Sequence, residues 1–229
     1  LAAPGKGPQG AYAMGVTQQL LPYFTDYFGV PYALPKLDQV AVPGTRNGAM
    51  EDWGLISYAE SLLLFDPASS DTNTQRRVFS LVAHEIAHQW WYGAVGNDQV
   101  HEPWLDESFA KYSEVLFYER YYPDFVEWWW RHHIDNRNRG GALDRTIYDF
   151  TDTATYIDQL YARGARFMGD LRALMSDADF FAFVKAYREA NEGRIATRDD
   201  FFAVVRAHTD ADLTPLLDAY FPEPQVQPK

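Results

Sequence analysis

The residues best suited to do chemistry are two histidines four positions apart in the stretch HEIAHQWW, residues 84–91. On an α-helix this spacing puts both side chains on one face, so His84 and His88 could bind the same metal ion. Glu85 follows the first histidine and faces nearly the same side. Apolar residues surround all three, and burial of ionisable groups is unfavourable unless something satisfies them. The stretch predicts a metal-binding helix with a glutamate free to act as a base.

A third ligand follows further along the chain. Glu107 comes after His88 with eighteen residues between, in the run PWLDESFA that predicts the start of a second helix. Two histidines and a glutamate form a catalytic zinc set, which leaves the fourth coordination position for water. A structural zinc normally uses four cysteine or histidine ligands, and the sequence contains no cysteine. We therefore expect one catalytic zinc ion.

Other ionisable residues near these motifs have weaker assignments. Glu114, seven positions after Glu107, falls on the same helix face. It is interpreted either as an acceptor for the N–H of a ligand histidine or as an ordinary surface glutamate. His132 and His133 are adjacent and point about 100° apart on a helix, so they cannot bind one ion as an i, i+4 pair does. His101 is interpreted as a surface or capping residue.

The elements that would position these residues differ between the two halves of the chain. Helically spaced apolar residues predict a helix over 11–28, with Gly29 as its C-cap. The runs LDQVAVPG and LISYAESLLLF predict short strands on either side of TRNGAMEDWG, where Asn47-Gly48 is a turn signal. From about Thr74 onward the pattern is helical. The predicted fold class is α+β, mainly α, with a small sheet in the N-terminal part followed by a helical lobe.

The chain as a whole reads as one globular domain over residues 1–229. Its ends, LAAPGKGPQG (1–10) and PEPQVQPK (222–229), are typical of a linker and a tail. With 47% hydrophobic residues it can bury a substantial core, and its net charge of −12 argues against a general nucleic-acid-binding surface. No stretch approaches the roughly 18 apolar residues that a transmembrane helix needs. The sequence assigns no cellular compartment.

Three motifs together resemble one known family. In the order GAMEDWGLISY, HEIAHQWW and WLDESFA, they are similar to the zinc aminopeptidases related to aminopeptidase N and the leukotriene epoxide hydrolase, of the gluzincin clan. The family pattern is GAMEN, HExxH and WLNEGFA. The resemblance extends to YARGARFMGDLRAL and covers nearly the whole chain. It implies a thermolysin-like zinc-peptidase catalytic domain from a longer parent, without the family's N-terminal β-domain and C-terminal helical domain.

The resemblance also implies a role for individual residues. Glu85 would be the general base and Tyr161, in YARG, would stabilise the oxyanion. The zinc ligands would be His84, His88 and Glu107. The substrate would be a peptide with a free N-terminus, whose α-ammonium binds Glu51 and whose backbone pairs with Gly48, Ala49 and Met50. A fixed carboxylate suits this task because its charge-assisted hydrogen bond also sets the distance from the N-terminus to the metal.

The sequence departs from the family pattern at Asp52, Asp106 and Ser108, where the pattern has asparagine, asparagine and glycine. These departures affect expectations of rate and specificity more than of reaction type. Two alternatives share the same metal set: a thermolysin-like endopeptidase, which needs no terminal amine, and a zinc-binding scaffold without catalysis. An epoxide-hydrolase side activity and the preferred N-terminal residue stay open.

Overall fold

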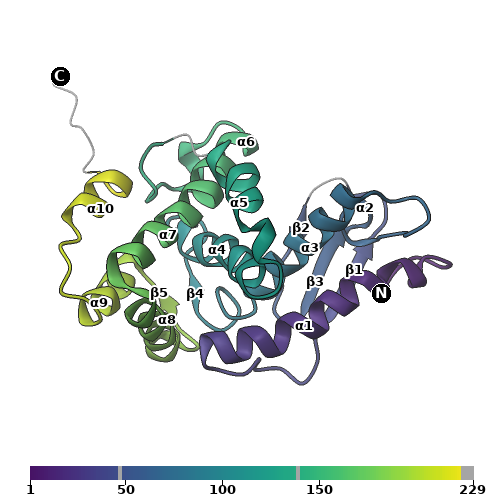
Figure 1. Ribbon diagram of the computed structural model, residues 1–229, viewed down its shortest axis with the longest axis horizontal. Helices are drawn as coiled ribbons and strands as arrows, with labels where there is room; N and C mark the ends of the chain where they lie inside the picture. The colour runs from purple at the N-terminus through teal and green to yellow at the C-terminus, as the bar shows by residue number, and fades with distance from the viewer. Residues whose placement is uncertain (46–47, 138–139, 223–229) are drawn as a thin grey trace.

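The computed structural model describes residues 1–45, 48–137 and 140–222. A small sheet lies at one end of the molecule and a helical lobe at the other (Figure 1). Helix α1 (Ala11–Phe28) runs beneath both, because it packs on α3 in the first part and on α8 in the second. Gly29 ends α1 in the left-handed conformation, with φ of 72°. The predicted helix and its cap are confirmed.

The main sheet has three strands in the order β1-β3-β2. Strands β1 and β3 are parallel, whereas β2 pairs antiparallel with β3 and forms an edge of the sheet. Their bounds are Asp38–Val42, Ala49–Met50 and Leu55–Ala59. Both predicted strands are present, but the second ends at Ala59 because residues 60–63 form the short helix α2 (Glu60–Leu63). The predicted turn at Asn47 lies outside the described residues.

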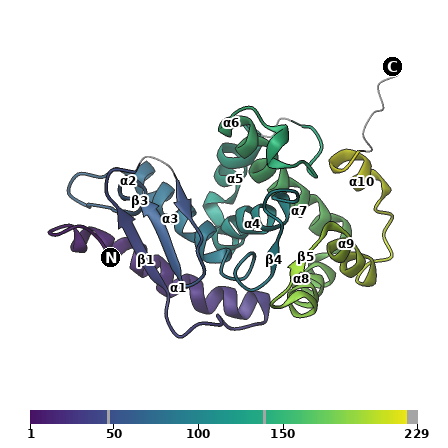
Figure 2. The same ribbon diagram turned by 180° about the vertical axis from the view of Figure 1, so that it is seen from behind.

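The second part of the chain is helical, which confirms the mainly α class with a small sheet. Figure 2 shows the sheet and α3 at one end, and α8 to α10 at the other. The helices are α3 (Thr72–Ala87), α4 (Trp104–Tyr121), α5 (Val126–Trp129), α6 (Thr153–Tyr156), α7 (Arg163–Met175), α8 (Asp177–Asn191), α9 (Arg198–Ala207) and α10 (Thr214–Tyr220). A capping box of Thr197 and Asp200 begins α9.

Several short elements were not predicted. The two-residue strands β4 (Gly96–Asn97) and β5 (Ile195–Ala196) pair in parallel and are too short to show an alternating pattern. The 3₁₀ segments are η1 (Gly7–Gly10), η2 (Pro123–Phe125) and η4 (Ile147–Asp149), and the π-helical segments are η3 (Trp130–Asp135) and η5 (Ile157–Ala162). A π-helical turn leaves no periodic apolar signature of its own, because it occupies only one turn.

The first ten residues lie against the domain, which differs from their linker-like composition. The backbone N–H of Ala41 donates to the Leu1 carbonyl at 2.9 Å, and the N–H of Phe65 donates to the Gln9 carbonyl at 2.9 Å. These hydrogen bonds fix the segment beside β1 although its glycines and prolines favour turns. Of the predicted tail, only Pro222 is described.

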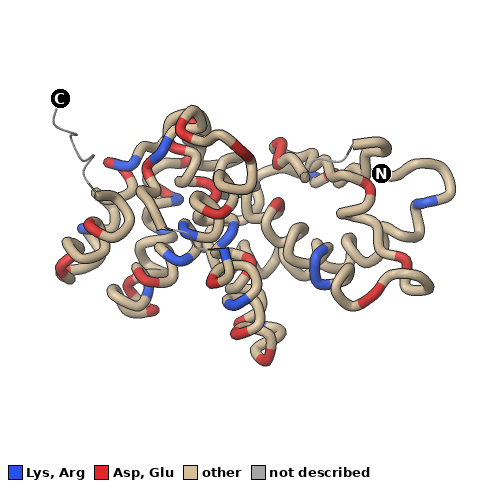
Figure 3. The backbone as a smooth tube through the Cα atoms, turned by 90° about the horizontal axis from the view of Figure 1, so that it is seen from above, with Lys and Arg blue, Asp and Glu red and all other residues tan. Residues whose placement is uncertain are grey.

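Charged residues of both signs are dispersed along the molecule (Figure 3). Lys and Arg are interspersed with Asp and Glu across the helical lobe. Within the described parts of the chain, no helix combines the length and apolarity needed to cross a membrane.

Helices α4 and α7 approach each other closely at Gly164. A Cβ atom at this position would collide with Ser108 Oγ, and Ser108 is fully buried. The glycine therefore lets the two helices touch at the residue that follows Glu107.

We expect Gly164→Ala to lower the free energy of unfolding by about 1–3 kcal/mol, because a buried methyl group must displace well-packed neighbours. Gly15→Ala is the matched control, since nothing lies within 4 Å of a Cβ there and α1 should gain helix propensity. Urea unfolding of both variants measures the difference. Equal stabilities would contradict the close contact.

Candidate metal centre and cleft

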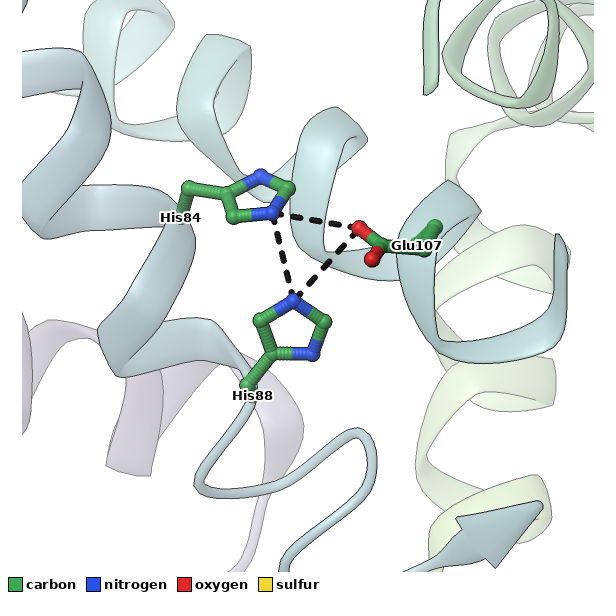
Figure 4. A group of neighbouring side chains, drawn as sticks. All are labelled: His84, His88 and Glu107. Atoms are coloured by element: carbon green, nitrogen blue, oxygen red, sulfur yellow. Dashed lines mark hydrogen bonds and ion pairs between the residues drawn. The ribbon is translucent and has the colours of Figure 1, made fainter. Parts of the chain in front are cut away.

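The two histidines of HEIAHQWW lie at the end of α3. Asp71 caps the start of this helix by accepting a hydrogen bond from the N–H of Thr74 at 2.7 Å. His88 follows the last helical residue and keeps right-handed helical dihedrals, so its ring stays on the same side as that of His84. The two Nε2 atoms are 3.2 Å apart (Figure 4). The structure therefore places the pair as the spacing predicts.

Glu107 reaches this pair from the first turn of α4 (Figure 4). Its Oε2 lies 3.2 Å from His84 Nε2 and 3.6 Å from His88 Nε2. This oxygen is buried and accepts no hydrogen bond of normal geometry from the described residues. Ligand atoms about 2.0–2.1 Å from a tetrahedral zinc lie roughly 3.3–3.5 Å apart, so the three atoms fit such an ion. The group could hold a metal.

The other nitrogen of each imidazole faces an oxygen atom. His88 Nδ1 is 2.9 Å from the carbonyl oxygen of Trp91 and therefore donates to it, which leaves the Nε2 lone pair for a metal. His84 Nδ1 is 3.3 Å from Glu114 Oε1. Glu114 is only 1% exposed, so it is not the surface glutamate of the alternative interpretation.

Glu114 is held by two residues that sequence analysis missed. Lys111 Nζ lies 2.8 Å and 3.0 Å from its two oxygens, and the indole N–H of Trp129 donates to Oε2 at 3.0 Å. Burial alone would raise the pKa of Glu114, but the Lys111 charge and the contact with His84 lower it to about 2. The i, i+3 spacing from Lys111 could have revealed the first partner, whereas nothing local marks Trp129.

His84, His88 and Glu107 are called the metal group below. Burial disfavours the charged forms of these side chains, whereas their contacts with one another favour them. Burial disfavours the charged form of His84, yet Glu107 and Glu114 raise its pKa to about 9. Burial likewise works against ionised Glu107, but His84 and His88 lower its pKa to about 2. Without a metal, the group is therefore an ion pair of imidazolium and carboxylate at neutral pH.

Two further predicted residues face the same group. Burial raises the pKa of Glu85 to about 7, and no described residue hydrogen-bonds to its carboxylate. Tyr161 lies in the π-helical segment η5 and donates its hydroxyl to Glu107 Oε1. Its ring stacks on that of His84, with centroids 5.5 Å apart. Burial, followed by the charge of Glu107, raises the pKa of Tyr161 well above its usual value, so its hydroxyl stays protonated.

A cleft of about 240 Å³ connects the metal group with β2 and Glu51. Gly48 and Ala49 line this cleft, whereas Met50 does not and is half-exposed. Ligand atoms of Glu51, Glu85 and His88 lie within 4.8 Å of one another, so the Glu51 carboxylate adjoins the metal group.

The three departures from the motif pattern occupy different environments. Asp52 is exposed, whereas Ser108 is buried against Gly164. Asp106 is 3% exposed, and burial, followed by the charge of Glu107, raises its pKa to about 7. None of the three belongs to the metal group of the described residues.

The remaining histidines lie outside the metal group. His101 is exposed and bonds to Asp98 at 2.7 Å, as expected for a surface residue. His132 Nδ1 lies 2.9 Å from the carbonyl oxygen of Trp128. Burial and Lys111 lower the pKa of His133 to about 4.

Comparison with known proteins gives consistent matches. The model of the peptidase family M1 domain matches residues 12–220. The chain is 34% identical to bovine endoplasmic reticulum aminopeptidase 2 over 88% of this chain and 22% of the relative. It is 32% identical to Arabidopsis thaliana aminopeptidase M1 over 94% of this chain and 26% of the relative. To mouse glutamyl aminopeptidase it is 47% identical over 49% of this chain and 12% of the relative.

The chain thus spans about an eighth to a quarter of the length of these curated relatives. The family match nevertheless covers most of the chain, including both ligand helices and the cleft. It also agrees with the motif resemblance and with the metal-binding geometry. The chain belongs to peptidase family M1.

Proposed function

We propose that this chain is the catalytic domain of a zinc-dependent aminopeptidase that hydrolyses the N-terminal peptide bond of peptides. Family membership and the aminopeptidase names of its relatives support a metallo-aminopeptidase. The observation that carries the proposal is the position of Glu51 in the cleft of the metal group. The proposal includes a thermolysin-like fold and further domains in a longer parent, since the relatives are much longer.

His84, His88 and Glu107 would hold one zinc ion. When bound, it would supply a Lewis acid that polarises the scissile carbonyl and acidifies water. Glu85 accepts the proton of the attacking water and passes it to the leaving amine, a task that suits a carboxylate with a pKa near neutrality. Tyr161 turns its hydroxyl from Glu107 toward the developing oxyanion and donates a hydrogen bond there.

Glu51 gives the proposal its exopeptidase character. A carboxylate fixed beside the metal group binds the substrate ammonium and lets only one residue fit between it and the scissile bond. The edge strand β2 offers free backbone groups to the peptide, and Gly48 and Ala49 leave room for its approach. A thermolysin-like endopeptidase would not need the Glu51 carboxylate.

Glu85→Gln should keep zinc binding and lower kcat about 100- to 10,000-fold, because the base is lost while the metal group stays intact. Elemental analysis gives the zinc content, and a fluorogenic aminoacyl substrate gives kcat. The exposed Glu189→Gln is the matched control. Undiminished turnover in Glu85→Gln would rule out Glu85 as the general base. Absence of turnover in the unmodified zinc-loaded chain would favour the alternative of a zinc-binding scaffold without catalysis.

Glu51→Gln should lower kcat/KM for a free dipeptide amide about 10- to 100-fold, since a charge-assisted hydrogen bond is lost. The unmodified chain should cleave the free dipeptide amide and spare its N-acetylated form. The neighbouring, exposed Asp52→Asn provides the control. Cleavage of the acetylated form would reject the aminopeptidase in favour of an endopeptidase.

Zinc affinity should rise with pH between about 6 and 9, because contact with Glu107 raises the pKa of both ligand histidines. Below its raised pKa of about 9, His84 is protonated, and zinc must displace that proton. Glu107, with its pKa lowered to about 2, is ionised throughout this range and adds no dependence. Calorimetric titration in buffers of different ionisation enthalpy measures the affinity and the released protons. A pH-independent affinity between pH 6 and 9 would contradict the charge assignment.

A further inference from the structure

A polar network between Glu51 and α4 takes no part in the proposed reaction. Gln99 lies in the loop between β4 and α4. Its Nε2 is 2.8 Å from Glu51 Oε1 and 2.9 Å from Asp106 Oδ2. One side-chain amide thus bridges two buried acidic side chains that come from distant parts of the chain.

The orientation of this amide follows from its partners. An ionised carboxylate only accepts hydrogen bonds, so both acidic groups must face the NH₂ end of Gln99. That NH₂ group has two hydrogens, one for each carboxylate, and both are used. Without the bridge, two buried carboxyl groups would lose the hydrogen-bond donor that they share, which is unfavourable.

The Asp106 end of the bridge is anchored to the metal-binding helix. Its Oδ1 accepts hydrogen bonds from Asn97 Nδ2 and from the backbone N–H of Glu107, each at 3.0 Å. Asp106 also precedes Glu107 in α4. Gln99 therefore ties Glu51 to a fixed point beside a proposed metal ligand.

The Glu51 end leaves one oxygen available. Gln99 engages Oε1, and in the described part of the chain no hydrogen bond engages Oε2, while Glu51 lines the cleft. The backbone of Glu51 is also held, because Gln89 Nε2 donates to its carbonyl at 3.2 Å. Only the side-chain torsions of Glu51 would be free without Gln99.

We propose that Gln99 is a positioning residue that fixes the Glu51 carboxylate against α4, so that one oxygen faces the cleft at a set distance from the metal group. This inference rests on the proposed function, in which Glu51 binds the substrate ammonium. Preorganising the carboxylate in this way removes the cost of ordering it when the ammonium binds.

The bridge also gives Asp106 a role where the family pattern has asparagine. An asparagine at this position could turn its own NH₂ toward Gln99, which would then present its oxygen there and withdraw its NH₂ from Glu51. An ionised aspartate has no such donor. Asp106→Asn should therefore weaken the same interaction as a change at Gln99.

The test is the affinity for an aminoacyl amide with a free α-amine relative to that for its N-acetylated form, measured by calorimetry on the zinc-loaded chain. Gln99→Leu should reduce the preference for the free amine about 10- to 100-fold, since the position of a charged hydrogen-bond partner is lost. Affinity for the acetylated form and zinc content should be unchanged. The exposed Gln18→Leu on α1 is the control and should keep the full preference.

Gln99→Asn has a shorter side chain that reaches only one carboxylate, so it should give a smaller loss of the preference for the free amine. If Gln99→Leu does not fold, Gln99→Asn is the variant that tests the inference. A full preference in the variant that folds would overturn this inference while leaving the proposed function intact. Equal loss of both ligands, or loss of zinc, would also overturn it, because that indicates general structural damage. If the unmodified chain shows no preference, or Glu51→Gln keeps it, the proposed function fails and this inference with it.

Discussion

The cleft depends on one buried contact, in which a carboxylate oxygen of Glu107 faces two imidazole nitrogens. Such groups are costly to remove from water unless opposite charges or a metal satisfy them. Here the carboxylate and imidazolium satisfy each other, and Glu114 with Lys111 balances the outer side of His84. A metal can replace the shared protons without moving the side chains far, because the spacing of their atoms already suits it.

Aromatic packing holds the two helices that make this contact. The rings of Trp91 and Phe109 stack with centroids 4.1 Å apart and so join the turn after α3 to α4. Trp104, at the first position of α4, is fully buried among Phe167, Phe201 and Phe221. Large apolar rings on both sides limit how far either helix can shift. This aromatic packing thus preorganises the side chains of His84, His88 and Glu107.

Sequence periodicity was sufficient for the long elements and the metal group. His84 and His88 share a helix, so their spacing fixes their relation, and the start of α4 was marked by Pro103 before Glu107. The Glu51 assignment depended on a motif, because its approach to α3 arises from tertiary packing. The bridge from Gln99 and the support from Trp129 joined segments far apart in sequence, so no local pattern could reveal them.

His88 lies one residue beyond the last helical residue of α3, and its ring is tethered to the backbone of the turn that follows. A metal held there would join the end of a helix to the start of the next, and so would close a loop between α3 and α4. Fraying of that helix end would remove a ligand, and a bound ion would oppose fraying. Metal binding and the local order of this turn are therefore thermodynamically coupled.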